Sequence, residues 1–462
     1  MKSRNIVSIL AIIFFIYFFS VIGSSCAQIG MPIGGPRDSL PPVLLASNPP
    51  NGSLHFNEKV IYLTFNEYVE LKNLQENLIV SPTPIINPVI NSKLRQVKIT
   101  LRDTLQPNTT YSLQLGNSIQ DINENNPYKD FNYVFSTGDY IDSLKFRGTV
   151  HLAETGKSDS TLIALLYSDL SDSAVYKKKP KYISRLDSSG NFSFRNLAYG
   201  TYHLFAIKDE SGQRMYTDPT QLFAFSDSAV IINQDTKSRQ IFAYQQEKEV
   251  PKATGNKTDK KTPLKFTTSM NGNIQDLLSG LTLDFNKPLR SFDSLKIKLT
   301  DTLFNAQPFT ISFTDTTNSK IKIQPTWKEE SFYKLILDSN FVKDTTGQSL
   351  VKNDTLSFKT KKETDYGSLK LNFKNLDKFK HPVLQFLSNN LIVNAYPLSS
   401  STFQLKLIAP GEYTLRMLED TNQNGKWDPG DYLNKKQPEL VRSIDKKLTI
   451  RANWDNETDL EL

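Results

Sequence analysis

The sequence predicts an all-β protein in which four β-sandwich domains in tandem follow a signal peptide, as an A–B pair of domains that occurs twice. Apolar residues alternate along short segments, for example at Ile61, Leu63 and Phe65, and this alternation is typical of half-buried antiparallel strands. Turn signals such as Asn51-Gly52 separate these segments at sandwich-like intervals. A chain of 462 residues also exceeds the roughly 250–300 residues that one core usually supports.

The second half of the chain repeats segments of the first half in the same order. The matching pairs are Leu63-Thr64-Phe65-Asn66 with Leu283-Asp284-Phe285-Asn286, Tyr111–Leu115 with Tyr333–Leu337, Asp121 with Asp344, Phe135-Ser136-Thr137 with Phe358-Lys359-Thr360, and Gly200-Thr201-Tyr202 with Gly411-Glu412-Tyr413. Repetition over this range indicates duplication of a two-domain unit.

Composition marks the breaks between the expected domains. Pro and Gly are frequent soon after Cys26, which indicates an extended tether. Lysines among polar residues mark a second break, and this composition is typical of a solvated linker. We expect a signal peptide over 1–25, a tether over 26–40, sandwiches over 41–140 and 141–244, a Lys-rich linker over 245–263, and sandwiches over 264–361 and 362–462.

The N-terminus has the three parts of an export signal. Lys2 and Arg4 precede an apolar run over 6–22, and small residues then lead to Cys26, the only cysteine of the chain. This order resembles the lipoprotein signals of Bacteroidetes, although Gly23 stands where Leu is common. The resemblance implies that Cys26 is acylated and holds the protein to the outer membrane, facing the periplasm or, alternatively, the cell surface. The other interpretations are a plain secretory peptide and an uncleaved anchor helix, with Cys26 incidental.

Each domain resembles a known family. Residues 41–138 resemble bacterial Ig-like domains of the SbsA type, and residues 264–361 resemble a degraded second copy. Residues 143–232 and 367–460 are similar to the transthyretin-like fold of carboxypeptidase regulatory domains. The residues that carry these resemblances are Leu63–Val69, Pro107–Leu113, Asp121 and Phe135–Gly138 for the first family, and Gly190–Phe194, Leu197, Gly200 and Tyr202 for the second. Both resemblances imply architecture more than activity.

One loop has the spacing of a calcium site. Oxygen-bearing side chains stand at positions 1, 3, 5, 9 and 12 of an EF-hand-like loop, with Gly425 at position 6 and a backbone carbonyl available at position 7. These candidate ligands are Asp420, Asn422, Asn424, Lys426 through its carbonyl, Asp428 and Asp431. The alternative is a hairpin whose side chains cap their own backbone. The matching loop at Asp209–Gly212 is too short to bind an ion, so one structural Ca²⁺ is the only expected cofactor.

A second pattern is the frequent triplet of Asp, then Ser or Thr, then a small or aliphatic residue. It resembles the O-glycosylation acceptor of Bacteroidetes, and the alternative is that Asp opens a turn before a strand. The triplets are centred on Ser39, Thr104, Ser143, Ser160, Ser173, Ser228, Ser294, Thr302, Thr316, Thr345 and Thr355.

The composition and the motifs give little support for an enzyme. One Cys excludes an internal disulfide framework, and four scattered His residues make a histidine metal centre improbable. No phosphate loop, metalloprotease motif or nucleophile elbow is found. The net charge of +7 and the basic run over 177–181 do not indicate a nucleic-acid partner. We expect a non-enzymatic envelope scaffold with envelope proteins as partners; the alternative is a glycan-binding or adhesion protein, in which Trp327, Trp427 or Trp454 stacks on sugars.

Overall fold

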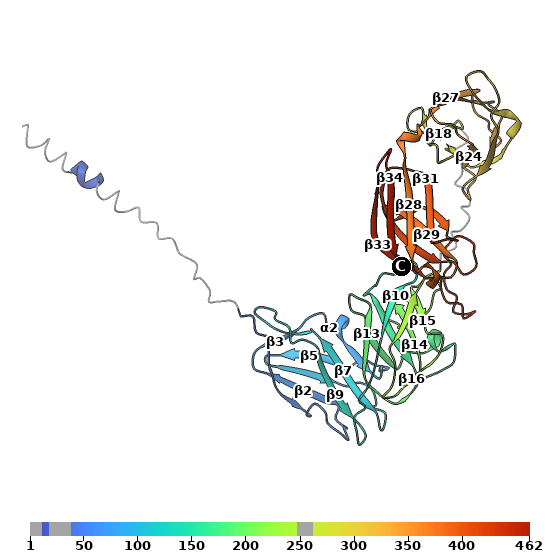
Figure 1. Ribbon diagram of the computed structural model, residues 1–462. Helices are drawn as coiled ribbons and strands as arrows, with labels where there is room; N and C mark the ends of the chain where they lie inside the picture. The colour runs from blue at the N-terminus through green and yellow to red at the C-terminus, as the bar shows by residue number, and fades with distance from the viewer. Residues whose placement is uncertain (1–11, 18–37, 247–261) are drawn as a thin grey trace, which may run out of the picture. The chain divides into compact units, whose positions relative to one another are not determined.

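The computed structural model describes residues 12–17, 38–246 and 262–462 (Figure 1). Cys26, most of the signal peptide and tether, and most of the Lys-rich linker lie outside the described residues, so their predictions stay predictions. Residues 12–17 are helical. Among the helices that the structure describes, none is long and apolar enough to cross a membrane.

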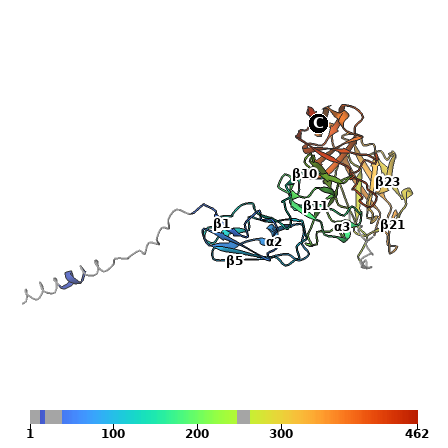
Figure 2. The same cartoon turned by 90° about the horizontal axis from the view of Figure 1, so that it is seen from below.

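From residue 38 onward nearly all regular secondary structure of the described chain is strand, as predicted, and helices α2 and α3 are single short turns (Figures 1 and 2). Contacts divide the chain into two compact units. The first contains residues 1–79 and 84–139, and the second contains residues 80–83 and 140–462. Four sandwiches are described below, the first in the first unit and the other three in the second.

The first sandwich has a four-stranded sheet in the order β1-β2-β6-β5, a three-stranded sheet β4-β7-β9 and a β3-β8 pair. Short helix α2 spans Leu74–Asn77. The strands are β1 Leu44–Asn48, β2 Val60–Phe65, β3 Val69–Leu71, β4 Ile79–Ser81, β5 Val89–Lys93, β6 Gln96–Thr100, β7 Thr110–Gly116, β8 Ile119–Asp121 and β9 Phe131–Ser136.

The second sandwich has sheets β13-β10-β17 and β12-β11-β14-β15, with β16 also paired to β14. Short helix α3 spans Ala174–Lys177, so the basic run begins in a helical turn. The strands are β10 Leu144–Leu152, β11 Leu162–Tyr167, β12 Tyr182–Arg185, β13 Asn191–Leu197, β14 Gly200–Lys208, β15 Phe223–Phe225, β16 Val230–Ile232 and β17 Arg239–Ala243.

The third sandwich has sheets β18-β20-β24-β23 and β19-β27-β25-β22 and a β21-β26 pair. Its strands are β18 Phe266–Thr268, β19 Ile274–Gln275, β20 Leu281–Phe285, β21 Leu289–Phe292, β22 Ile297–Thr300, β23 Phe309–Phe313, β24 Lys320–Pro325, β25 Phe332–Leu337, β26 Val342–Asp344 and β27 Asp354–Thr360.

The fourth sandwich has sheets β31-β28-β34 and β30-β29-β32-β33. Its strands are β28 Gly367–Lys374, β29 Pro382–Ser388, β30 Leu391–Pro397, β31 Thr402–Ile408, β32 Gly411–Glu419, β33 Val441–Ile450 and β34 Asp455–Glu461. Three 3₁₀ turns, η1 Ser294–Lys296, η2 Glu363–Asp365 and η3 Leu376–Lys378, complete the second unit.

Strand order supports the predicted duplication. The β1-β2-β6-β5 sheet corresponds to β18-β20-β24-β23, and the β3-β8 pair corresponds to β21-β26. In the other domain type, β10 pairs in parallel with β17 just as β28 pairs in parallel with β34. Two sandwiches of each type thus share both order and strand direction.

Apolar cores explain these sheets. Alternate residues of β2 are buried, which is the period-two burial that the sequence predicts. In the second sandwich, Leu204 of β14 belongs to a core that also contains Phe146 and Phe192. In the fourth, Leu415 of β32 belongs to the matching core.

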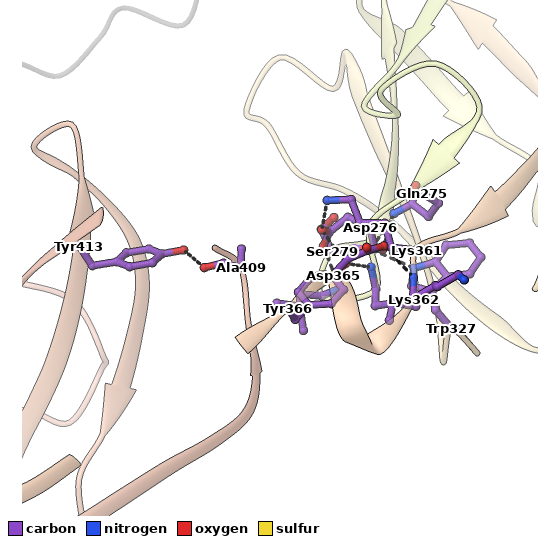
Figure 3. Close-up of polar contacts among 12 residues, drawn as sticks. Gln275, Asp276, Ser279, Trp327, Lys361, Lys362, Asp365, Tyr366, Ala409 and Tyr413 are labelled. Atoms are coloured by element: carbon purple, nitrogen blue, oxygen red, sulfur yellow. Dashed lines mark hydrogen bonds and ion pairs between the residues drawn. The ribbon is translucent and has the colours of Figure 1, made fainter. Parts of the chain in front are cut away.

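A tyrosine marks the matching corner of both B-type sandwiches. The Tyr202 hydroxyl donates a hydrogen bond to the Ala198 carbonyl at 3.1 Å. The Tyr413 hydroxyl donates to the Ala409 carbonyl at 2.9 Å (Figure 3). Because each bond runs back to the carbonyl four residues before the tyrosine, the repeated Gly-x-Tyr segments are structurally equivalent.

Candidate functional site: the loop over residues 420–440

The long loop between β32 and β33 begins at a buried carboxylate. Asp420 accepts the backbone N–H groups of Asn424 at 3.2 Å and Gly425 at 2.7 Å. Gly425 has φ of 76°, a left-handed conformation that glycine adopts without strain. The first half of the predicted calcium loop therefore winds around Asp420.

Three further candidate ligands converge beyond Asp420. The side-chain amides of Asn422 and Asn424 both donate to one oxygen of Asp428, and the Asn424 bond is 2.8 Å long. The Asn424 side-chain oxygen accepts the N–H of Lys426 at 2.7 Å. The structure thus brings together the residues at positions 1, 3, 5 and 9.

The residue at position 12 lies in a separate turn. Asp431 accepts hydrogen bonds from the backbone and side chain of Asn434, and these bonds lower the pKa of its carboxyl group. Its backbone pairs with Lys436 in both directions at 2.8 Å. Asp431 therefore makes its contacts away from Asp428.

Glu439 is the loop residue that the sequence analysis missed. Its side chain is buried, and one carboxylate oxygen accepts the N–H and hydroxyl of Thr421, both at 2.8 Å. The other oxygen accepts the N–H of Asp428 at 3.1 Å, and the Glu439 carbonyl accepts the indole N–H of Trp427 at 2.8 Å. Glu439 stands outside the twelve-residue spacing, so no local pattern in the sequence identifies it.

The oxygen atoms of the loop are of the chemical kind that binds a hard cation. Carboxylate and amide oxygens are the ligands that Ca²⁺ takes in proteins. Within the part of the chain that the structure describes, no group of three or more His, Cys, Asp or Glu side chains is placed to hold a metal ion. The converging donors here are two aspartates and two asparagines.

The far end of the loop carries Tyr432 into an aromatic cluster of the second sandwich. Its ring is 4% exposed and lies 5.1 Å from the Phe225 ring, 5.3 Å from Phe223 and 5.5 Å from Phe205, between centroids. Its hydroxyl donates to the Asp172 carbonyl at 3.3 Å. Burial, together with the nearby charge of Asp172, raises the pKa of Tyr432 to about 12.

The strands that receive Tyr432 are apolar on both faces. Leu204 and Ala224 belong to the core of the second sandwich, whereas Phe205, Phe223 and Phe225 are buried but do not belong to it. Strands buried on both sides have near-continuous apolar sequences. The run Phe223-Ala224-Phe225 is this signal, and it could have indicated a covered outer face.

Polar contacts flank the aromatic cluster. The Lys435 ammonium lies 2.5 Å from a carboxylate oxygen of Asp172 and 3.9 Å from the centre of the Tyr432 ring. The Gln437 side chain donates to the Phe225 carbonyl at 3.1 Å. These contacts fix the loop around the inserted tyrosine.

A second row of contacts joins β33 to the turn after β10. The Val441 N–H donates to the Ala153 carbonyl at 2.9 Å, which extends backbone pairing between the two sandwiches. The buried Arg416 guanidinium donates to the Glu154 carbonyl at 3.1 Å. Together with the loop contacts, this row forms what we call the joint: residues 416–443 of the fourth sandwich against the second.

Gly430 shows how closely the loop approaches the second sandwich. A Cβ atom at this position would lie 2.6 Å from the ring of Tyr244. Its carbonyl accepts a hydrogen bond from the Gln246 side chain at 3.4 Å. Glycine is required here because the backbone packs directly on an aromatic ring.

The three tryptophans have different surroundings. Trp327 is buried and its indole N–H donates to the Ser279 carbonyl at 2.9 Å. Trp454 is exposed beneath the Arg451 guanidinium, at 5.0 Å from the ring centre. Trp427 is half-buried and lines a cleft of about 1040 Å³ at the joint. Polar side chains make up most of its remaining lining, among them Glu154, Thr155, Asp159, Lys208, Thr217 and Gln221.

A compact polar cluster also connects the third and fourth sandwiches (Figure 3). The Tyr366 hydroxyl donates to Asp276 at 2.8 Å and accepts the N–H of Leu277 at 2.7 Å. The ammonium of Lys361 lies 3.4 Å from the same Asp276 carboxylate. The third sandwich is therefore hydrogen-bonded to the start of the fourth.

Several of the Asp-Ser and Asp-Thr triplets form turns. In five of them the Asp carboxylate accepts the N–H group two residues later, which is the turn role that the sequence allows. These bonds run to Leu40, Thr161, Leu295, Leu303 and Thr346. Modification of their hydroxyl groups stays a prediction.

Comparison with known proteins supports the predicted Ig-like fold of the first sandwich. Residues 38–137 match the family model for a bacterial Ig-like domain, which confirms the Ig-like resemblance of this segment. The matched segment is less than a quarter of the chain. No curated protein matches the sequence.

Among solved structures, the chain is similar to the major pilin subunit BcpA of Bacillus cereus, at 10% identity and a TM-score of 0.17, over 69% of this chain and 99% of the pilin. It is also similar to the BSP domain of a biofilm-associated protein, at 10% and 0.16, over 86% and 97%. A third is the N-terminal part of the bacterial S-layer protein SbsC, at 14% and 0.16, over 45% and 44%. At these scores the likenesses carry no argument about function.

Proposed function

We propose that the chain is a non-enzymatic scaffold of the cell envelope, anchored to the outer membrane through lipid on Cys26 and facing the periplasm. The observation that carries this proposal is the joint. Loops on a rigid fold are where binding and catalytic groups usually stand. Here the longest loop of the fourth sandwich is occupied by contacts with the second, so its residues fix the domains.

Envelope proteins are the proposed partners, and recovery from detergent-solubilised envelope tests this. We expect stoichiometric membrane proteins to copurify with the intact chain and to be reduced in a Tyr432→Ala variant, whose joint is loosened. A Tyr199→Ala variant is the matched control, because Tyr199 is exposed and lies outside the joint. Recovery of the chain without any stoichiometric partner would contradict the proposed role.

The lipid anchor has a direct test of its own. Metabolic labelling with an alkyne fatty acid should mark the chain and place it in the membrane fraction. A Cys26→Ser variant should carry no label and leave that fraction, because several acyl chains on one residue provide the anchoring energy. Membrane retention of unlabelled Cys26→Ser protein would favour an anchor helix.

We also propose that the 420–428 loop binds one structural Ca²⁺ through Asp420, Asn422, Asn424, the Lys426 carbonyl and Asp428, with Asp431 as the remaining candidate. Their oxygen chemistry supports the proposal, as do the convergence of Asn422 and Asn424 on Asp428 and the winding of the loop backbone around Asp420. Calorimetry of the chain with CaCl₂ should give heat, and Ca²⁺ should raise the melting temperature. Asp420→Asn should remove both effects and Asp209→Asn should remove neither. Absence of heat in the intact chain would contradict calcium binding and favour the alternative, a hairpin whose side chains cap their own backbone.

Glycan binding is the second candidate function, and the cleft beside Trp427 is the observation that favours it. A half-buried indole bordered by polar side chains is suited to stacking on a sugar ring. Retention on a glycan array that is lost in Trp427→Ala but kept in Trp454→Ala would support this role. Failure to bind any glycan would exclude it for this cleft.

A further inference from the structure

The edge strand β30 of the fourth sandwich differs from the other strands in its surface. Leu391, Ile392 and Val393 are 71%, 47% and 46% exposed, and no other described strand exposes three large apolar side chains in succession. One side of β30 pairs with β29. For the other side, the described part of the chain shows no hydrogen bond or ion pair to residues 391–397.

Charge is absent around this edge. No charged residue occurs from Pro382 to Leu405, although 22% of the chain is charged. The opposite edge of the same sheet, β33, carries Arg442, Asp445, Lys446 and Lys447. Natural proteins usually place charges, bulges or proline on exposed edges to prevent edge-to-edge association. The sheet therefore has one edge protected by charges and one without them, where the protection is limited to a bulge at Val393 and to Pro397 at the end of the strand.

The duplicated copy shows how this edge is closed elsewhere. Strand β12, which matches β30, is buried over Tyr182–Ser184. The Ser184 hydroxyl donates to the Ser193 carbonyl and accepts the Ser193 N–H, both at 3.1 Å, and so ties β12 to β13. In the fourth sandwich no corresponding bond joins β30 to β31 among the described residues. The hydrogen-bonded seam of the second sandwich thus has no counterpart among the described residues of the fourth, where the rings of Tyr396 in β30 and Phe403 in β31 are in contact instead, 5.1 Å apart between centroids.

We propose that β30 pairs antiparallel with β30 of a second copy of this chain. Two-fold pairing covers the apolar side chains of both strands at once and brings no like charges together. A second β30 suits this edge better than β34, whose Asp455, Glu457, Asp459 and Glu461 would lie against Leu391–Val393. A seven-residue strand pair is smaller than a stable interface, so the dimer dissociates on dilution. This proposal is independent of the envelope function.

Sedimentation equilibrium of the purified chain, with Cys26→Ser to remove lipid-driven association, tests the proposal. A reversible monomer–dimer equilibrium is expected. Ile392→Lys should raise the dimer dissociation constant by about tenfold or more, because two like charges then meet across the pair. Ile231→Lys is the matched control, since Ile231 is an exposed isoleucine of the second sandwich. Unchanged Trp454 fluorescence and melting temperature would show that the fold is retained.

Cysteine scanning identifies the strand that forms the interface. Single cysteines at positions 391–395 in the Cys26→Ser chain should yield a disulfide-linked dimer on oxidation at one or two adjacent positions, nearest the two-fold axis. Ile231→Cys should yield none. A monomer at every concentration up to about 1 mM would overturn the proposal. So would a dimer insensitive to Ile392→Lys, or a scan without any cross-link.

Discussion

The two copies of the duplicated pair share their strand order but differ in the loop after the matching strands β14 and β32. In the first copy the loop is short and closes on itself, with Asp209 accepting the Arg214 N–H at 3.1 Å. In the second copy the loop spans 420–440 and inserts Tyr432 between aromatic rings of the first copy. The second copy therefore supplies the inserted loop, and the first copy supplies the aromatic surface that receives it.

This difference shows how two copies of a duplicated domain pair can take different roles within one compact unit. The residues inside each sandwich are matched, as at Tyr202 and Tyr413. Loop length and outer-face residues have diverged, because they are free of the packing that constrains a core. The second and fourth sandwiches, which the third separates in sequence, thus gain a direct contact.

A second difference concerns the second residue after the matching strands β2 and β20. In the first sandwich it is Glu67, which lies near Asp121. In the third it is Lys287, whose ammonium lies 3.6 Å from Asp344. The side chain at this position faces a like charge in the first sandwich and an opposite charge in the third.

The largest expected effect is the loss of this buried ion pair. Lys287 and Asp344 are 4% and 0% exposed, so Lys287→Met leaves a buried carboxylate without its cation and should cost about 3–5 kcal/mol. Denaturant unfolding followed by Trp327 fluorescence, which reports on the third sandwich, measures this loss. Lys320→Met removes an exposed pair with Asp284 and should cost less than about 1 kcal/mol. Equal losses in the two variants would contradict the contrast between the copies.

Removal of the inserted ring is expected to have the next largest effect. Tyr432→Ala empties a packed aromatic site and should destabilise the joint by about 3 kcal/mol. Trp427 fluorescence should change before Trp327 fluorescence during denaturation, because only Trp427 borders the joint. Tyr432→Phe keeps the ring and should cost about 1 kcal/mol, through the hydroxyl bond to Asp172. Coincident transitions in Tyr432→Ala would show that the joint has no separate stability.

A smaller effect is expected where the loop backbone meets Tyr244. Gly430→Ala places a methyl group against the ring and should cost about 1–3 kcal/mol. Hydrogen exchange should then quicken at Val441, whose N–H bonds across the joint, and stay unchanged at Leu335 in the third sandwich. Unchanged exchange at Val441 would mean that the loop packs more loosely than its backbone position indicates.

The smallest expected effect depends on pH. Burial, with the charges of Asp121, Asp38 and Glu124, raises the pKa of Glu67 above its ordinary value of 4.5. The folded state then holds this proton more tightly than the unfolded chain, so the contribution of Glu67 to stability falls as pH rises through that window. Glu67→Gln should raise the melting temperature of the first sandwich at neutral pH and have no effect below about pH 4.

The control for this prediction is Glu58→Gln, because Glu58 is exposed on the same sandwich. It should leave the melting temperature unchanged at both pH values. A loss of stability in Glu67→Gln at neutral pH would mean that Glu67 forms a favourable contact instead of a repulsive one.

The sequence predicts much of the fold because strands and turns have local patterns. Alternation at Ile61, Leu63 and Phe65 indicates a half-buried strand, and its structural counterpart is β2. The repeat of Gly-x-Tyr predicts the equivalence of Tyr202 and Tyr413 without any knowledge of their hydrogen bonds. These inferences need only residues that are close together in the chain.

The candidate site was predicted only in part because its contacts are distant in sequence. Spacing placed Asp420, Asn422, Asn424 and Asp428 together, but it could not reveal that Glu439 caps the same loop. The docking of Tyr432 on residues more than 200 positions earlier has no local signature. Doubly apolar strands indicate a covered face, but they do not identify the segment that covers it.

The most direct test of the joint is zero-length carbodiimide cross-linking of the purified chain, followed by mass spectrometry. The Lys435 ammonium and the Asp172 carboxylate are 2.5 Å apart, so the reagent should join them in the monomer. The cross-link should vanish in Tyr432→Ala, whereas the Lys320–Asp284 cross-link within the third sandwich should persist. Formation of the Lys320–Asp284 cross-link without the Lys435–Asp172 cross-link in the intact chain would contradict the docking of the fourth sandwich on the second.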